Sequence, residues 1–192
     1  MGAGKSAALE AFARHGAAVL SSDDVVHALY RDPEVVRAVR DRFGDQVLAP
    51  DGAIDRGLLG PRAFNEDGGI EFLERLLHPR IGAWRERWVR EQAAASPAPP
   101  AVVCEVPLLF EVGLADAFDA VIVVTAPEHV RRARVEARGQ SFDDRRARQW
   151  DEDAKVAAAD MAFSNDRDLA ALDDFVAGVL GRYAGAGAGG TA

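Results

Sequence analysis

Cysteine and long apolar runs are both nearly absent from this chain. Cys104 is the only cysteine among 192 residues, which excludes an intrachain disulfide and suits a reducing compartment, so we expect a cytoplasmic protein. No apolar run reaches the length of a membrane span, and no basic region followed by an apolar core marks a signal peptide. We therefore expect neither a disulfide-stabilised scaffold nor a membrane protein.

Basic residues are fewer than acidic ones, 23 against 31. The formal net charge is −8, which argues against binding of nucleic acid through an extended basic surface. The length supports one core with small insertions. We expect a monomer, although the sequence leaves an oligomer open. Lysine is rarest among the basic residues, because only Lys5 and Lys155 are present.

One of these two lysines lies in the segment "GAGKS", which matches the end of a phosphate-binding loop, G-x-x-x-x-G-K-[ST]. In such a P-loop, backbone amides surround phosphates, the lysine pairs with their charge and the hydroxyl binds Mg²⁺. Gly4, Lys5 and Ser6 match, whereas the first glycine would precede Met1. A chance occurrence is the alternative. The helix predicted over 6–15 favours the functional interpretation, because anions bind at helix N-termini.

Short apolar segments alternate with helical patterns along the chain. Uninterrupted apolar runs are typical of strands in a parallel sheet that is covered on both faces, so we expect a three-layer α/β domain of the P-loop NTPase type. The strands are predicted at 17–20, 101–106, 118–125 and 161–165. We expect a single domain whose parts are a core over 1–30, 96–137 and 159–183, a helical insertion over about 31–95, a lid over about 138–158 and a flexible tail over 184–192.

An acidic pair, Asp23 and Asp24, follows the strand predicted at 17–20. In an open parallel sheet, ligands bind at the carboxyl ends of the strands. A carboxylate at that edge can accept the proton of a substrate hydroxyl or help to hold Mg²⁺. Asp24 is the better candidate for the cap of the next helix and Asp23 for the functional carboxylate. Their adjacency leaves the reverse assignment open.

A group of seven arginines follows the strand predicted at 118–125. Guanidinium groups match phosphate oxygens bidentately, so one or two of these residues on a lid could bind the transferring phosphoryl group. The others are expected on a solvated helix face. We select Arg138 and Arg145 from the set 131, 132, 134, 138, 145, 146 and 148.

The chain resembles dephospho-coenzyme A kinases along nearly its full length. The resemblance rests on the order and spacing of "GAGKS", "VLSSDDVVHAL", "RFGDQVLAPDGAIDR", "LLHPRI", "EVPLLFE", "RRARQ" and "DMAFSN". It implies transfer of the γ-phosphate of ATP, with Mg²⁺, to the ribose 3′-hydroxyl of dephospho-coenzyme A, the last step of coenzyme A synthesis. It also implies a helical coenzyme A-binding insertion and a sheet of order 2-3-1-4-5.

The resemblance implies a role for each candidate residue. Asp23 corresponds to the proposed base, Arg138 and Arg145 to lid positions, and Asn165 to a position near the adenine. The ATP phosphates would bind Gly2, Ala3, Gly4, Lys5, Ser6 and Ala7, with Ser6 on Mg²⁺. Besides Asp23, the acceptor would contact Arg56, Phe64, His78, Glu105 and Leu108.

Two of these candidates have equally plausible structural roles, and Glu105 has a second possible function. Leu108 is explained as well by packing, and the pair His78-Pro79 as well by a junction between two helices. Glu105, placed beside the phosphate loop, could instead orient Mg²⁺ through water.

The sequence departs from the family pattern at several positions. Ser21 replaces the first aspartate of a D-A-D segment, Ala7 replaces a threonine, and Gly60-Pro61 predicts a local irregularity in a helix. The first strand, central in the family's sheet, is missing, which would leave its neighbours unpaired. We therefore expect a natural start about ten residues upstream, and a 192-residue chain that is poorly stable or inactive.

Other functions stay open. One is a small P-loop kinase acting on a nucleoside monophosphate or another metabolite. Another is a nucleotide-dependent switch, although no N-K-x-D-like guanine-specifying segment is present. A third is a non-catalytic nucleotide-binding module.

Overall fold

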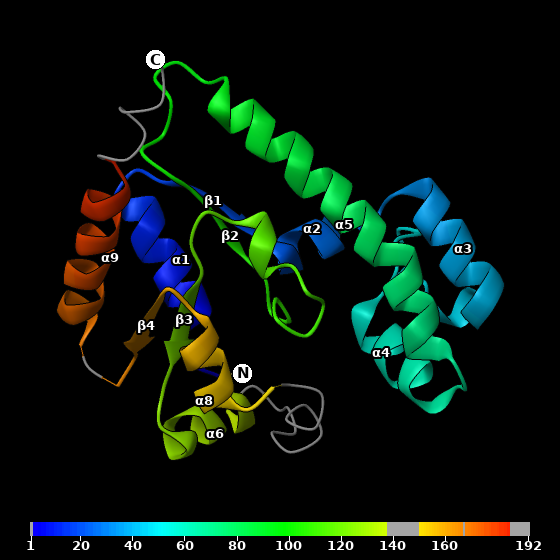
Figure 1. The fold of residues 1–192 in the computed structure, drawn as a ribbon. Helices are drawn as coiled ribbons and strands as arrows, with labels where there is room; N and C mark the ends of the chain where they lie inside the picture. Colours follow the sequence, from blue (N-terminus) through cyan, green and yellow to red (C-terminus); the bar gives the residue numbers. More distant parts are fainter. Residues whose placement is uncertain (1, 138–149, 167, 185–192) are drawn as a thin grey trace. The chain divides into compact units, whose positions relative to one another are not determined.

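The computed structural model describes residues 2–137, 150–166 and 168–184 (Figure 1). The chain divides into two compact units, one made of Met1–Val19 with Pro97–Ala192 and the other of Leu20–Ser96. The predicted division into a core, an insertion over about 31–95 and a lid stays a prediction. In the part of the chain that the structure describes, no helix combines the length and apolar character that crossing a bilayer requires.

The first unit alternates helices with short strands, as the sequence predicts. Its helices are α1 (Lys5–Arg14), α6 (Glu128–Glu136), α8 (Glu152–Ala158) and α9 (Leu169–Ala184). Its strands are β2 (Val102–Glu105), β3 (Ile122–Thr125) and β4 (Met161–Ser164), and β1 (Ala18–Ser21) begins in this unit. A short 3-10 helix, Ala115–Ala117, lies between β2 and β3.

The strands form two hydrogen-bonded pairs. β3 runs parallel to β4, in a register that joins Ile122 to Met161 and Thr125 to Ser164. The other pair is β1 with β2. These findings confirm an α/β fold with parallel strand pairing. Because the family's first strand is missing, β1 to β4 correspond to strands 2 to 5 of the expected order 2-3-1-4-5. That order contains both pairs and stays a prediction as a whole.

The core of the first unit lies where helices cover these strands. α1 packs against α9 (Figure 1), and their facing residues Ala11, Leu172 and Val176 are at most 1% exposed. Val103 of β2 and Val124 of β3 pack against the same cluster. This packing fixes the position of α1, which begins at Lys5, within the phosphate-loop motif.

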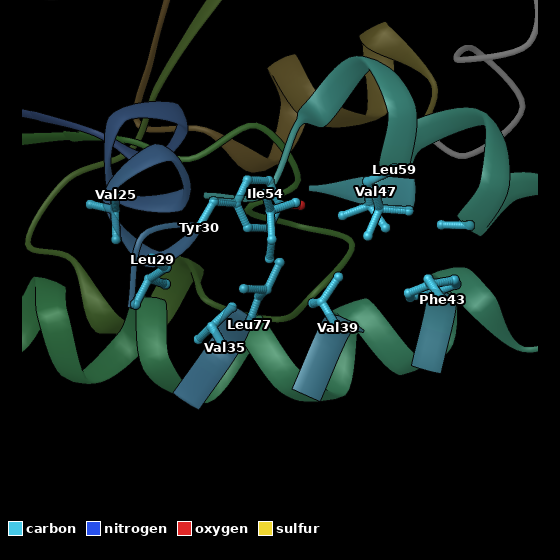
Figure 2. Packing of buried hydrophobic residues seen from close by; sticks show 11 residues of the cluster. Val25, Leu29, Tyr30, Val35, Val39, Phe43, Val47, Ile54, Leu59 and Leu77 are labelled. Atoms are coloured by element: carbon cyan, nitrogen blue, oxygen red, sulfur yellow. The ribbon is translucent and has the colours of Figure 1, made fainter. Parts of the chain in front are cut away.

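The second unit is helical around its own core. Its helices are α2 (Ser22–Leu29), α3 (Pro33–Phe43), α4 (Arg56–Asn65) and α5 (Gly69–Ala93), with a 3-10 turn at Asp45–Val47. Val35, Val39 and Phe43 share one face of α3 at a spacing of four residues. They are at most 1% exposed and pack in one cluster with Leu59 and Leu77 (Figure 2).

The start of α2 differs from the predicted one. Its N-cap is Ser21, in extended conformation and without a side-chain capping bond, so the prediction of Asp24 as the cap is wrong. Asp23 and Asp24 both lie in the first turn of α2. Carboxylates are favourable there because the helix dipole is positive at its N-terminus, and no cap is needed to explain either of them.

Two prolines expected to interrupt helices do not. α5 runs continuously through His78-Pro79 and α4 through Gly60-Pro61, so the predicted helix junction and the predicted irregularity are both wrong. A proline inside a helix removes one backbone hydrogen bond. Packing offsets that loss, because the residue two positions before each proline, Leu77 in α5 and Leu59 in α4, is buried in the core.

Candidate active site

The loop before α1 has the geometry of an anion-binding helix start. Gly2 and Gly4 have φ of 72° and 95°, the left-handed region that glycine tolerates. Gly4 is the N-cap of α1, makes no side-chain capping bond, and is followed by a first turn without acidic residues. The first amides of a helix have no intrahelical acceptor, so those of residues 5–7 are suited to a phosphate.

The carbonyl oxygens of this loop are bound from the other side. Asn165 Nδ2 donates to the carbonyl oxygen of Ala3 at 2.9 Å, and Arg134 Nη1 donates to that of Gly2 at 3.2 Å. A Cβ atom on Gly4 would lie 1.9 Å from Asn165 Nδ2. The close approach of Asn165 therefore requires glycine at position 4. The predicted contact of Asn165 with adenine stays a prediction.

Lys5 pairs with Glu105, the last residue of β2. Lys5 Nζ lies 3.5 Å from Glu105 Oε1, and the two side chains are 35% and 11% exposed. The expectation that Glu105 lies beside the phosphate loop is confirmed. Ser6, the next residue of α1, is exposed.

The oxygen donors here suit Mg²⁺ of the kind that bridges nucleotide phosphates. Among the described residues, no cluster of three or more His, Cys, Asp or Glu side chains could hold a metal ion. Mg²⁺ that binds nucleotide phosphates usually takes only one or two oxygen ligands from the protein, and phosphates and water complete its coordination shell. The Ser6 hydroxyl and the Glu105 carboxylate are oxygen ligands of the kind that Mg²⁺ prefers.

A cavity of about 400 Å³ opens beside Lys5. Its wall includes β3 and the cationic side chains of Lys5, Arg131 and Lys155. The ring of Trp150, at its edge, stacks on Phe110 with centroids 5.8 Å apart. Four carboxylates, those of Glu111, Asp151, Glu152 and Asp153, line the cavity as well, so its wall combines both signs of charge with an aromatic pair.

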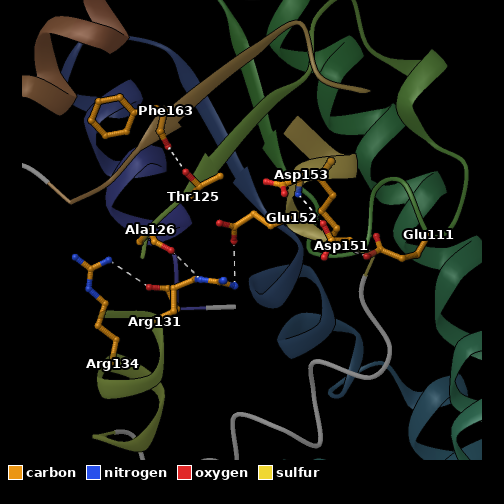
Figure 3. Close-up of polar contacts among 11 residues, drawn as sticks. Glu111, Thr125, Ala126, Arg131, Arg134, Asp151, Glu152, Asp153 and Phe163 are labelled. Carbon is orange, nitrogen blue, oxygen red and sulfur yellow. Dashed lines mark hydrogen bonds and ion pairs between the residues drawn. The ribbon is translucent and has the colours of Figure 1, made fainter. Parts of the chain in front are cut away.

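Two ion pairs lie in the wall of this cavity, and Figure 3 shows the one between Arg131 and Glu152. Arg131 Nη1 lies 3.0 Å from Glu152 Oε2, while its Nε donates to the carbonyl oxygen of Ala126. Glu111 Oε1 accepts from Lys155 Nζ at 2.6 Å and from the backbone amide of Trp150 at 2.9 Å. The pairing of Lys155 with Glu111 was not predicted from the sequence. The feature that could have drawn attention to Lys155 is that it is one of only two lysines.

The environment of Glu111 shifts its titration. Burial favours the neutral carboxyl, but the hydrogen bonds from Lys155 and the Trp150 amide outweigh burial and lower the pKa of Glu111. Its second oxygen, Oε2, is buried without a hydrogen-bond partner. The carboxylate thus stays ionised and fixes the start of α8 against the turn after β2.

The second unit brings Asp23 and Arg56 together. Arg56 Nη2 donates to Asp23 Oδ1 at 3.4 Å, and the two side chains are 52% and 66% exposed. Tyr30, buried nearby, has a raised pKa because burial disfavours its phenolate, although the charge of Arg56 opposes the shift. The pair presents a carboxylate and a guanidinium to solvent.

The remaining predicted acceptor residues are dispersed. Phe64 is 67% exposed on α4 and His78 is exposed on α5, both in the second unit. Leu108 lies half-buried in the turn after β2, in the first unit, where its carbonyl accepts from Val112. Their contacts with a substrate stay predictions. Arg138 and Arg145 lie outside the described residues.

Comparisons with known proteins agree on one family. The family model described as dephospho-CoA kinase matches residues 1–171. A dephospho-CoA kinase of Thermobifida fusca is 37% identical over 185 residues, covering 93% of this chain and 90% of the relative. One of Aromatoleum aromaticum is 36% identical over 189 residues, covering 95% and 90%. One of Mycolicibacterium paratuberculosis is 37% identical over 177 residues, which span 90% of this chain and 42% of that longer protein.

Solved structures share the fold. TT1252 of Thermus thermophilus is 28% identical with a TM-score of 0.75, and the match covers 95% of this chain and 93% of that one. Dephospho-CoA kinase of Campylobacter jejuni is 24% identical with a TM-score of 0.70, covering 96% and 93%. The chain therefore belongs to the dephospho-CoA kinase family, enzymes that phosphorylate dephospho-coenzyme A with ATP in coenzyme A biosynthesis.

Proposed function

We propose that the two polar clusters divide the family's reaction between them, with the phosphate loop binding ATP and the Asp23–Arg56 pair binding the 3′-hydroxyl end of dephospho-coenzyme A. The observation that carries this proposal is the start of α1, where Gly4, Lys5 and the first helical amides form one cationic site. Phosphoryl transfer depends mainly on positioning and charge stabilisation. A fixed loop and a lysine supply both.

On the ATP side, the amides of residues 4–7 donate to the β- and γ-phosphates and Lys5 neutralises their charge. Glu105 keeps the Lys5 ammonium at the cavity. Bound Mg²⁺ would be held by Ser6, with support from Glu105, and would supply charge neutralisation between the phosphates. Arg138 and Arg145 would bind the transferring group from the lid.

On the acceptor side, Asp23 accepts the proton of the 3′-hydroxyl as the new ester bond forms. A general base must lie within hydrogen-bond reach of that proton, and Arg56 holds the carboxylate by a bond of 3.4 Å. Arg56 is also available to the acceptor's phosphates. Phe64, exposed on α4, offers an apolar face to the pantetheine arm, and His78 and Leu108 are further proposed contacts.

We place the reaction in the cytoplasm, in a monomer. The proposal for the compartment is supported by the cysteine content, because a single cysteine suits a reducing environment.

A coupled ATP-turnover assay tests this function. We expect dephospho-coenzyme A, but not AMP, to stimulate ADP release, and the product to carry its new phosphate on the ribose 3′-hydroxyl, as phosphorus NMR would show. A preparation that binds ATP in calorimetry yet leaves dephospho-coenzyme A unmodified would contradict the proposal. Preferential phosphorylation of AMP would point to a nucleoside monophosphate kinase instead.

A further inference from the structure

We propose that Arg134 and Asn165 are positioning residues of the phosphate loop, which act through the loop backbone rather than by touching the nucleotide. Neither residue holds a phosphate in the proposed function. This inference rests on that function in one respect, because it takes the start of α1 as the anion site. We call the two side chains and the carbonyls they bind, those of Gly2 and Ala3, the loop clamp.

The loop clamp acts on the carbonyl side of the loop backbone. Both side chains donate to carbonyl oxygens of the loop, Asn165 to Ala3 at 2.9 Å and Arg134 to Gly2 at 3.2 Å. A peptide unit whose carbonyl is fixed has a fixed orientation of the attached amide as well, because the unit is planar. Binding two successive carbonyls therefore orients the amides of Ala3 and Gly4.

The loop clamp is itself anchored to the end of β3 and to the segment after β4. The backbone amide of Asn165 donates to the Thr125 carbonyl at the end of β3, at 2.7 Å. Arg134 Nη2 donates to the carbonyl oxygen of Asn165 at 3.4 Å, so the guanidinium joins the loop to the segment after β4. The clamp thus connects the loop to the parallel pair β3–β4. A loop held to a rigid strand pair is pre-organised for its ligand.

Asn165 is also buried and lies closely against the loop. Asn165, 8% exposed, is the one buried polar residue among the described parts of the chain. Such a group is costly unless its hydrogen bonds are made, and its amide group fits against Gly4, where a Cβ atom would collide with it. On the other side, a Cβ on Gly2 would lie 2.6 Å from the Arg131 carbonyl of α6. The Asn165 side chain, Gly2 and Gly4 therefore fit together in the one loop conformation that the structure shows.

The test measures binding of two probes to the purified full chain, by calorimetry. The probes are ATP and inorganic tripolyphosphate, which has phosphates but no adenine. We expect Asn165→Ala and Arg134→Gln each to weaken binding of both probes by the same factor, about three- to tenfold, because each removes one or two hydrogen bonds. In the double variant the losses should not simply add, since both side chains hold one loop.

Two alternatives give different results. If Asn165 acts on the adenine, Asn165→Ala weakens ATP binding and leaves tripolyphosphate binding unchanged, which would overturn the clamp. If Arg134 acts only by its charge, Arg134→Lys restores wild-type binding, whereas the clamp predicts that Lys retains only part of it, because one ammonium cannot reproduce the fork of the guanidinium.

Folding is controlled separately. Binding is measured well below each variant's melting temperature, and Arg182→Lys, on α9 at the other end of the chain, is the matched control that should bind as wild type. A merely structural role would lower the melting temperature without changing either affinity, and that outcome contradicts the proposal. Where Asn165→Ala does not fold, Asn165→Ser and Arg134→Gln give the same comparison. The probes need no acceptor, so failure of the kinase assay and failure of the clamp are distinguishable.

Discussion

Lys5 Nζ lies 3.5 Å from Glu105 Oε1, and this ion pair joins the first turn of α1 to the end of β2. The lysine stem is held between a helix and a strand, so the ammonium stays at the cavity beside the loop. The helix dipole adds positive potential at the same point. A carboxylate near a phosphate site is unfavourable by itself, but here it restrains the lysine that we propose neutralises the ligand.

Replacing this lysine should abolish most of the turnover. Lys5→Met keeps the apolar stem but removes the charge, and we expect kcat to fall about 10²- to 10³-fold, as when a transition-state donor is removed elsewhere. Glu105→Gln should cost less, because the amide can still accept a hydrogen bond. Steady-state kinetics with Glu10→Gln, exposed on the same helix, provide the control. Lys5→Met with near-normal kcat would remove Lys5 from the proposed site.

Asp23 and Asp24 offer a matched pair for the base assignment. Both lie in the first turn of α2 and are exposed, so their helix-dipole contributions are similar. Asp23→Asn should lower kcat about 10²- to 10⁴-fold with ATP affinity nearly unchanged, whereas Asp24→Asn should behave as wild type. Equal effects of the two substitutions would show that the first-turn charge matters and not a base.

The Glu111–Lys155 pair should make stability depend on pH in acid. The folded pKa of Glu111 is lowered from the ordinary value of 4.5. Its contribution is therefore complete above that ordinary value and is lost as the pH falls through the lower folded pKa. Urea unfolding from about pH 7 to about pH 3 should show Glu111→Gln less stable at neutral pH, with the difference shrinking in acid. A pH-independent difference would contradict this account.

Two adjacent leucines of α4 test the core of the second unit. Leu59 is 1% exposed and Leu58 is 51% exposed. Leu59→Ala should reduce the free energy of unfolding by about 2–5 kcal/mol through the cavity that it leaves, whereas Leu58→Ala should change it by less than about 0.5 kcal/mol. Chemical denaturation measures both. A similar cost at the two positions would mean that α4 does not pack as described.

Local signals made much of this structure predictable. The bounds of α3 are visible in its own residues, because Pro33 suits the first helical turn and Gly44, at φ 87°, suits the end of the helix. The apolar runs that predicted strands contain β2, β3 and β4 and all of β1 except its last residue, since burial of a strand is visible in its own residues. The GKS segment, together with the helical pattern that follows it, predicted a helix start with the geometry of an anion site.

Partners distant in sequence were not predictable. The Asn165 bond to Ala3 spans 162 residues and the Arg134 bond to Gly2 spans 132, and no local pattern specifies which carbonyl a buried amide will bind. The same holds for Lys155 with Glu111, and for the continuation of α5 through Pro79, where packing outweighs local propensity.

The sequence by itself determined the alternation of elements, the phosphate-loop residues and the family, because these depend on residue type and spacing along the chain. Only the tertiary structure decided what holds that loop, which carboxylate faces Lys5 and which guanidinium faces Asp23. Those choices depend on distances across the fold, where one hydrogen bond replaces another at little cost and packing selects between them.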